Sequence, residues 1–346
     1  MKSIYAVMKM KNDSDIIESF CRYHAHIYDG MILCDDGSED STVQIAEKLI
    51  AEGINIILLH RSNWPRDINK PDTDFYNWMA ETAFDQHGAD IALCVNIDEF
   101  MCSLDGKNPR EYLENLDEST LYKLRRYNAI YENEPTNSTR FLPEHFQLYL
   151  DGSHDYSGRV VLSRYLFKEQ GGRVGLGVHN IEFPEGKAFP LVAECTPLCY
   201  AHYAVRGAMQ YTLKIATGWL TFGMYKIEGA ASHWKRAYEL IKSSGVLTPQ
   251  QTKELSYYML VANNIENPIT HEINAEVLYS FLKENKPLRK LPLRQNVSVI
   301  LRAILPSNSK FPKKPNIVLS YTDYNEINKK YLGLILSHVE GLLSAI

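Results

Sequence analysis

The sequence predicts an α/β fold with a doubly wound, mostly parallel, Rossmann-like sheet, followed by a mainly helical C-terminal extension. Short apolar runs alternate with amphipathic helical patterns, and these runs lie at 3–8, 31–34, 54–59 and 91–95. Such alternation predicts parallel strands joined by right-handed helical crossovers. In addition, the acidic segments 35–42 and 96–99 directly follow two of the runs. Open α/β sheets bind ligands at the carboxyl ends of their strands, so a site is expected there.

The first run is too short for a helix and ends in a polar segment, so it predicts a strand followed by a loop. A helix pattern follows, with Ile16, Phe20 and His24 on one stripe. We expect Asp13 or Ser14 to cap the start of this helix and Gly30 to mark its end.

The later elements follow the same logic. A helical stripe over 43–50 ends at Gly53, and a second helix is expected over 75–87, after a long polar loop at 60–74. Further strands are expected at 121–127, 159–163 and 198–201. Residues 218–346 are expected to form the helical extension, and residues 1–217 the main domain.

The segment 95–102 carries the most informative polar cluster. Asn96, Asp98 and Glu99 follow a run that predicts a fully buried strand. Carboxylate oxygens are the ligands that Mg²⁺ and Mn²⁺ prefer, and substrate phosphates usually complete such sites. The cluster therefore favours a metal–diphosphate site. The alternative is that Asp98 and Glu99 cap a helix or lie in a solvated loop.

A second acidic cluster follows the strand at 31–34. Asp35 and Asp36 precede Gly37, which can adopt a positive φ angle in a tight turn. Their carboxylates could then accept hydrogen bonds from a nucleobase or a ribose hydroxyl. The alternative is an Asx-rich turn followed by a helix capped by Asp40 or Ser41.

Four segments in order resemble motifs of glycosyltransferase family 2. Residues 35–42 (DDGSEDST) resemble its DDGSxDxT signature, and residues 96–100 (NIDEF) resemble the DxDEF form of the metal motif in its GT-A relatives. Lys11 and Asn12 resemble the start of a KNE motif that has Asp13 in place of Glu. Residues 201–214 resemble an HYxxRS...Q...K segment. The resemblance covers roughly residues 1 to 220.

The resemblance implies a GT-A fold, a nucleotide-sugar donor (a UDP-sugar foremost) and Mn²⁺ or Mg²⁺. It implies Asp98 and His202 as metal ligands, and Asp98 and Glu99 as groups that take part in catalysis. The donor-binding residues that it implies are Lys11, Asn12, Asp35, Asp36, Asn96, Arg206 and Lys214. Asn96 replaces an acid of the family pattern and removes one negative charge, so Asp98 is the better metal ligand.

His202 follows a strand-like run that would return it to the sheet edge, and imidazole suits Mn²⁺ better than Mg²⁺. A purely structural histidine is an equally open interpretation. Arg206 is expected one helical turn further on, and Lys214 two turns beyond that. The two cations could neutralise a leaving diphosphate, or they could lie on a solvated helix face.

The resemblance implies an inverting reaction, which needs a carboxylate base near the acceptor hydroxyl. Asp155 lies in a turn expected at 152–158, and Glu182 and Glu194 are also eligible. The acceptor side is expected around 121–180, where His179 resembles a GxH position.

Composition limits the class of protein. The 346 residues carry a net charge of −5, which argues against nucleic acid as a partner. The six cysteines lie mostly within expected strands and helices, which favours a reducing, cytoplasmic location. Since the sequence has no signal-like segment and no run of eighteen apolar residues, we expect it to be neither secreted nor membrane-spanning.

The extension contains expected helices at 232–243, 248–263 and 275–284, then a segment at 286–314 that is rich in Lys and Arg and has no Asp or Glu. Basic residues among apolar ones are compatible with peripheral contact with an anionic membrane that presents a glycolipid. The alternative is a helical cap whose basic residues keep it soluble.

Together these features predict a glycosyltransferase that modifies a glycan or glycolipid hydroxyl, as in polysaccharide or lipopolysaccharide biosynthesis. A sugar nucleotidyltransferase would normally carry a glycine-rich loop after the first strand, and 9–13 contains no glycine. A non-catalytic nucleotide-sugar or glycan-binding protein would tolerate Asn96 in the metal motif.

Overall fold

The computed structural model of the protein describes residues 1–38, 40–64, 73–135, 141–146, 149–151, 158–175, 178–225, 232–261 and 270–271. The candidate base Asp155, the helix expected at 275–284 and the basic segment 286–314 lie outside the described residues.

The described strands are β1 (Ile4–Met10), β2 (Gly30–Asp35), β3 (Ile56–His60), β4 (Ile91–Cys94), β5 (Glu99–Ser103), β6 (Leu121–Ala129), β7 (Tyr149–Asp151), β8 (Arg159–Ser163), β9 (Arg173–Val174), β10 (Ile181–Glu182), β11 (Val192–His202) and β12 (Thr270–His271). The α-helices are α1 (Ile17–His24), α2 (Thr42–Ala51), α3 (Thr73–Gln86), α4 (Pro109–Leu113), α5 (Ala208–Tyr225), α6 (Ser232–Ser244) and α7 (Pro249–Val261).

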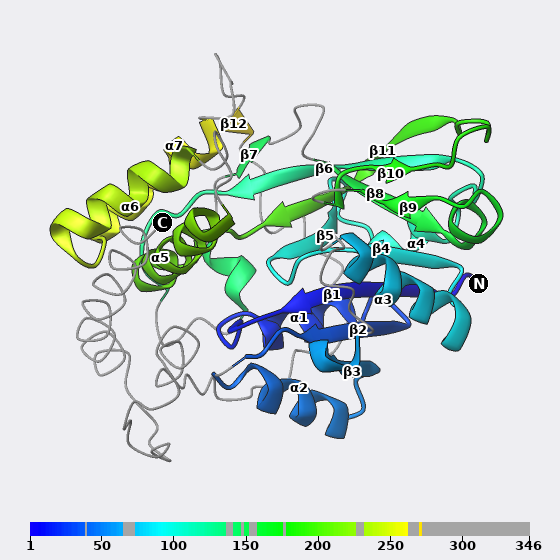
Figure 1. The fold of residues 1–346 in the computed structure, drawn as a ribbon, viewed down its shortest axis with the longest axis horizontal. Helices are drawn as coiled ribbons and strands as arrows, with labels where there is room; N and C mark the ends of the chain where they lie inside the picture. Colours follow the sequence, from blue (N-terminus) through cyan, green and yellow to red (C-terminus); the bar gives the residue numbers. More distant parts are fainter. Residues whose placement is uncertain are drawn as a thin grey trace.

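Most strands form one mixed sheet in the order β12-β7-β6-β8-β4-β1-β2-β3 (Figure 1). Strands β3, β2, β1 and β4 are mutually parallel, whereas β8, β6, β7 and β12 follow in antiparallel pairs. Strand β11 pairs in parallel with β6 and antiparallel with β5. The expected α/β, Rossmann-like class is confirmed, and antiparallel strands extend its parallel half.

Helices cover both faces of the parallel strands, as the continuous apolar runs require. Successive residues of β1 alternate between two cores because strand side chains point to opposite faces. Ile4, Ala6 and Met8 belong to the core shared with α1 and α2. Tyr5 and Val7 belong to the core shared with α3.

The ends of α1 differ from the sequence expectation. The helix begins at Ile17 after Ile16, which provides no side-chain cap, so the expected capping by Asp13 or Ser14 is wrong. The Asp13 carboxylate instead accepts a hydrogen bond from the Lys11 backbone N–H (2.9 Å). The helix ends at His24, earlier than expected. Gly30, where we expected the helix to stop, is instead the first residue of β2.

Helices α5, α6 and α7 gather at one end of the molecule (Figure 1) around a third apolar core that includes Ile215, Tyr238 and Leu255. Helix α5 runs without a break across residues 217 and 218, where the boundary between two domains is expected. The two-domain division stays a prediction. In the described part of the chain, the helices are all too short or too polar to cross a membrane.

Candidate active site

Asp98 lies in the turn between β4 and β5, at the carboxyl end of the parallel strands. The turn is closed by a hydrogen bond from Glu99 N to Asn96 O (3.0 Å). The backbone of Tyr203, just after β11, donates to Asp98 O (2.8 Å). These bonds fix the Asp98 side chain between the end of β4 and the end of β11.

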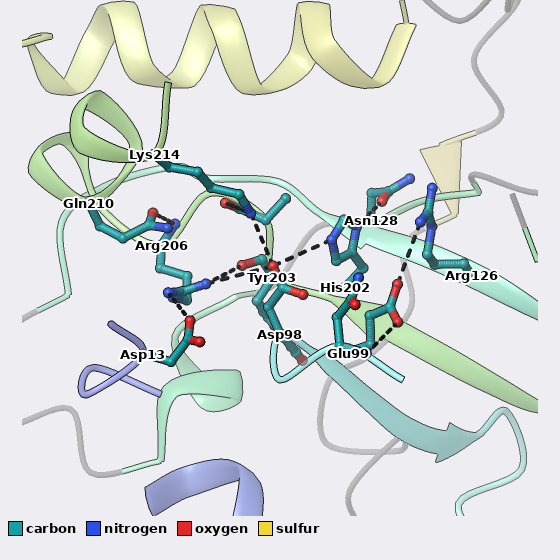
Figure 2. Close-up of polar contacts among 12 residues, drawn as sticks. Asp13, Asp98, Glu99, Arg126, Asn128, His202, Tyr203, Arg206, Gln210 and Lys214 are labelled. Atoms are coloured by element: carbon teal, nitrogen blue, oxygen red, sulfur yellow. Dashed lines mark hydrogen bonds and ion pairs between the residues drawn. The ribbon is translucent and has the colours of Figure 1, made fainter. Parts of the chain in front are cut away.

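Three nitrogen atoms surround one oxygen of Asp98 (Figure 2). Its Oδ2 lies 3.1 Å from Lys214 Nζ, 3.6 Å from His202 Nε2 and 3.8 Å from Arg206 Nη1. Burial alone would raise the pKa of Asp98, but nearby positive charge, foremost that of Lys214 and also that of Arg206, outweighs burial and holds the pKa well below its usual range. Asp98 is therefore an ionised carboxylate in a buried setting.

Strand register explains the position of His202. It lies opposite Glu99 of β5 and Asn128 of β6. Its Nδ1 lies 2.7 Å from Asn128 Oδ1. Since the amide oxygen accepts, Nδ1 carries the proton and Nε2 presents its lone pair toward Asp98. Burial lowers the pKa of His202, which keeps the ring neutral.

This donor set fits a divalent metal ion. A histidine that ligates a metal usually donates its other N–H to an oxygen, as His202 does to Asn128. Two ligands of one ion at about 2.1 Å lie roughly 3.0 to 3.6 Å apart, and Asp98 Oδ2 and His202 Nε2 are 3.6 Å apart. The described residues contain no group of three His, Cys, Asp or Glu side chains placed to hold a metal. Substrate phosphates or water would have to complete the coordination, as is usual for Mg²⁺ and related ions.

Glu99, the neighbour of Asp98, is completely buried, and its carboxylate contacts other residues than Asp98 does. Arg159 donates through Nε to Oε2 (2.7 Å) and through Nη2 to Oε1 (2.8 Å). Asn96 N also donates to Oε2 (3.1 Å). Although burial opposes ionisation, Arg159 lowers the pKa of Glu99 to about 2. With 0% exposure, Glu99 has no access to an acceptor hydroxyl and instead fixes the turn that carries Asp98.

Asn96 is held on the side of α3. Its Oδ1 accepts a hydrogen bond from Tyr76 Oη (3.2 Å). The amide that replaces the acid of the DxD pattern is thus engaged with a helix, while Asp98 faces His202 and Lys214.

Arg206 forms the rear of the site. It lies before α5, which begins at Ala208, so the expectation that it sits one helical turn beyond His202 is wrong. Its Nε and Nη2 donate to both carboxylate oxygens of Asp15 (2.6 and 2.9 Å), and Asp13 lies 3.7 Å from Nη2. Arg206 is therefore held firmly while it contributes positive charge beside Asp98.

The turn after β2 contains the other predicted nucleotide-binding residues. Asp35 accepts hydrogen bonds from the backbone N–H groups of Ser38 (2.9 Å) and Gly37 (3.2 Å), and Gly37 has a φ angle of +79°. Asp35 thus shapes the turn, as the Asx-turn alternative expects. Asp36 is half-buried, and its carboxylate lies 2.5 Å from Arg61 Nη1 and 3.7 Å from Lys9 Nζ.

Asn12 joins this turn to the loop after β1. Its backbone has a φ angle of +55°, and its N–H donates to Ser38 Oγ (3.0 Å). Its Oδ1 accepts from the backbone of Asp40 (3.4 Å). Lys11, the residue before it, is exposed. The structure therefore gives Asn12 a bracing role, while Lys11 remains available at the surface.

The two described candidates for the catalytic base lie at the surface. Glu194 is exposed and forms an ion pair with Arg125 (3.1 Å). Glu182 is exposed in β10, which pairs with β9 in a small two-stranded sheet. His179, expected on the acceptor side, is partly buried, with Nδ1 3.0 Å from Gly158 O.

Several residues in or beside the site were not selected from the sequence: Asp15, Arg126, Asn128 and Arg159. Arg126 and Asn128 are two positions apart in β6, so they lie on one face of the strand. The expected strand at 121–127 stopped one residue short of Asn128. Asn128 is a polar residue next to a run of buried residues, and this contrast is the sequence signal that could have indicated its role.

No model of a known protein family matches the chain, and no curated protein matches its sequence. Among solved structures, it is similar to the mannosyltransferase PcManGT from Pyrobaculum calidifontis in complex with GDP-Man and Mn²⁺. That match has 12% identity and a TM-score of 0.35, and it covers 76% of this chain and 74% of that chain.

A second similar structure is glucosyl-3-phosphoglycerate synthase from Mycobacterium tuberculosis in complex with Mn²⁺, UDP-glucose and phosphoglyceric acid. It shows 18% identity and a TM-score of 0.28, over 48% of this chain and 58% of that chain. HddC from Yersinia pseudotuberculosis shows 10% identity and a TM-score of 0.30, over 58% of this chain and 93% of that chain. Because these TM-scores are all below 0.5, we base the functional proposal on the residues of the site.

Proposed function

We propose that the protein is a metal-dependent glycosyltransferase that moves a sugar from a nucleotide diphosphate donor, foremost a UDP-sugar, to a hydroxyl group of a glycan or glycolipid. One observation carries this proposal: Asp98 Oδ2 lies 3.6 Å from His202 Nε2 and 3.1 Å from Lys214 Nζ at the carboxyl end of the parallel strands. Such a centre suits a divalent cation together with a diphosphate.

Asp98 and His202 would hold the metal ion, and the imidazole ligand favours Mn²⁺ over Mg²⁺. When bound, the ion would supply positive charge to the diphosphate that leaves during sugar transfer. Asn128 would keep the Nε2 atom of His202 available, and Glu99 would hold the turn in place through Arg159.

Lys214 and Arg206 would act differently on the leaving group. The Lys214 side chain is 35% exposed, so its flexible stem can carry the ammonium group from Asp98 to a phosphate. Arg206 is 5% exposed and bound to Asp15, so it would act as a fixed charge. Negative charge grows on the diphosphate in the transition state, and preorganised cations stabilise it there.

The nucleoside would bind at the turn after β2. Asp36 is the half-buried carboxylate of that turn, and Asp35 would support it by shaping the backbone. Lys11 and Asn96 flank this region as further donor contacts. The catalytic base stays a prediction, with Asp155 as the residue we propose, together with an inverting reaction, a cytoplasmic location and peripheral contact of 286–314 with anionic membranes.

The test is a thermal-shift panel of UDP, GDP, CMP and dTDP, and of their sugar conjugates, with and without Mn²⁺. We expect a UDP-sugar to raise the unfolding temperature of the full chain only when Mn²⁺ is present. Release of free nucleotide from the stabilising donor, followed over hours, separates an enzyme from a binding protein. If every nucleotide leaves the unfolding temperature unchanged, the proposal fails.

A further inference from the structure

Arg126 is a nearly buried arginine whose charge the site does not use. Its side chain is 16% exposed, and it projects from β6 on the same face as Asn128. Its one ion-pair contact within the described residues is Nη1 to Glu99 Oε1 at 3.5 Å. Its Nε is buried and has no hydrogen-bond partner in the part of the chain that the structure describes.

The carboxylate near Arg126 is already neutralised. Glu99 accepts both strong hydrogen bonds from Arg159, at 2.7 and 2.8 Å, so one arginine balances its charge. A second guanidinium beside this pair leaves an excess positive charge in a poorly hydrated place. Burial lowers the pKa of Arg126 and repulsion from Arg159 adds to this effect, while attraction by Glu99 and Asp98 offsets only part of it. A buried charge that shares its one close carboxylate with another arginine is only partly compensated, and an anion would complete that compensation.

Arg126 lies away from the groups that would hold the donor. Figure 2 shows Arg206 and Lys214 on one side of Asp98 and Arg126 on the other. In the sheet, β6 is separated from β1 by β8 and β4, whereas the turn that would bind the nucleoside follows β2 on the opposite side of β1. A ligand that reaches Arg126 would thus approach Asp98 from the side opposite to the diphosphate.

We propose that Arg126 binds an anionic group of the sugar acceptor, so that the acceptor carries a carboxylate or a phosphate near the hydroxyl that receives the sugar. This inference rests on the proposed function and narrows its acceptor class. A guanidinium presents paired N–H donors that match both anions, and within the described residues Glu99 contacts Arg126 only through Nη1, while the side chain as a whole keeps 16% of its surface exposed.

The experiment uses the full chain saturated with UDP and Mn²⁺, which occupy the donor side. Calorimetric titrations at constant ionic strength compare glucuronate, glucose 6-phosphate and neutral glucose. We expect glucuronate or glucose 6-phosphate to bind more tightly than glucose, and the better of the two identifies the anion. Arg126→Gln should weaken that binding by about 10- to 100-fold, the range for losing a charge-assisted hydrogen bond.

Arg125→Gln is the matched control, because Arg125 is the next residue in β6 and its exposed side chain pairs with Glu194. We expect this variant to bind the anionic sugars as the unchanged protein does. Equal weakening in both variants, or equal binding of glucose and both anionic sugars, would overturn the inference. Weaker UDP binding in Arg126→Gln would also overturn it, since Arg126 would then serve the donor.

Arg126→Lys keeps the charge and decides the matter if Arg126→Gln does not fold. A lysine cannot offer the paired donors, so the anionic sugar should bind several-fold more weakly than to the unchanged protein. Unaltered binding would contradict the inference. A failure of UDP and Mn²⁺ to bind the unchanged protein would instead overturn the proposed function, which separates the two outcomes.

Discussion

Two polar regions at the same edge of the sheet differ in what their side chains contact. The paired loops, residues 11–14 and 35–42, use their side chains to bind backbone N–H groups of each other. Asp13 N donates to Thr42 Oγ1 (2.8 Å), and Ser14 N donates to Asp40 Oδ2 (3.1 Å). The Asp98 centre, defined as Asp98, Asn128, His202, Arg206 and Lys214, is built from side chains that contact one another.

The difference separates groups that maintain the fold from groups that remain available to a ligand. When a carboxylate accepts hydrogen bonds from backbone N–H groups, its oxygen atoms support local structure. Its loss should therefore lower the free energy of unfolding. Asp98 Oδ2 instead faces three nitrogen groups at 3.1 to 3.8 Å, and Lys214 can withdraw toward solvent. Changes in the Asp98 centre should therefore alter ligand binding more than the free energy of unfolding.

The largest effect is expected from Asp98→Asn. A neutral amide is a weak metal ligand, so the variant should lose the Mn²⁺-dependent increase in unfolding temperature that UDP gives. Its own unfolding temperature should fall only modestly: the folded protein favours the ionised carboxylate, but Lys214 becomes solvated once that carboxylate is gone, and Arg206 keeps its pairing with Asp15. Differential scanning fluorimetry measures both quantities, with Asp85→Asn on the exposed side of α3 as the control. A full response to UDP and Mn²⁺ in Asp98→Asn would contradict the assignment.

Glu99→Gln tests the carboxylate next to Asp98. Like the side chains of the paired loops, Glu99 supports the local structure. Loss of its charge removes the ion pair of the buried Arg159, which should lower the free energy of unfolding by about 3–5 kcal/mol. Urea unfolding at pH 7 measures this change. Arg159→Lys is a useful companion because it keeps a positive charge but cannot form both hydrogen bonds.

The same variant has a pH signature. The pKa of Glu99 falls from 4.5 to about 2 in the folded protein. Between these values the unfolded chain binds more protons than the folded one, so the stabilisation is complete above pH 4.5 and is lost as the pH falls toward 2. Glu99→Gln should lack this component, and its unfolding free energy should fall less steeply with acid. An identical acid dependence in both proteins would refute this explanation.

The sequence predicted the parts of both regions that depend on local pattern. The parallel strands, the position of Asp98 after β4 and the positive φ angle at Gly37 follow from apolar runs and turn residues. The predicted start of α1 and the predicted place of Arg206 were wrong, because the Asp13 carboxylate accepts a local hydrogen bond from Lys11 N instead of capping α1, and α5 begins only at Ala208.

The partners in the Asp98 centre could not be predicted from local pattern. Asn128 meets His202 only because β11 pairs with β6 in one particular register. Arg159 reaches Glu99 because β8 lies between β4 and β6. Strand order and register arise from packing over the whole chain, and a single sequence carries no local signal for them.

Lys214→Met sharpens the comparison within the Asp98 centre. The ammonium group lies 3.1 Å from the oxygen that would bind the metal, so the two cations compete for it. Without nucleotide, the variant should bind Mn²⁺ about tenfold more tightly, as expected when a close opposing charge is removed. With Mn²⁺ present, UDP should bind more weakly because a phosphate contact is lost. Electron paramagnetic resonance of free Mn²⁺ and calorimetry with UDP measure the two constants, and Lys253→Met on α7 is the control. Shifts of the same sign would show that Lys214 does not exchange between the two partners.

The smallest effect is expected from Asp40→Ala in the paired loops. Asp40 Oδ1 accepts from Thr42 N (2.9 Å) at the start of α2, and Oδ2 accepts from Ser14 N. Ser41, not Asp40, is the N-cap residue of α2, and loss of the hydrogen bonds that Asp40 accepts should lower the free energy of unfolding by about 1 kcal/mol. Asp40→Asn keeps one acceptor at the helix start and should recover part of that loss. The affinity of the folded protein for UDP and Mn²⁺ should stay the same in both variants, because the Asp40 carboxylate binds Ser14 and Thr42 and contacts neither Asp36, the proposed nucleoside contact, nor the Asp98 centre. Chemical unfolding and nucleotide titration on the same samples test this separation. Weaker nucleotide binding without any loss of stability would mean that the paired loops contact the ligand directly through Asp40.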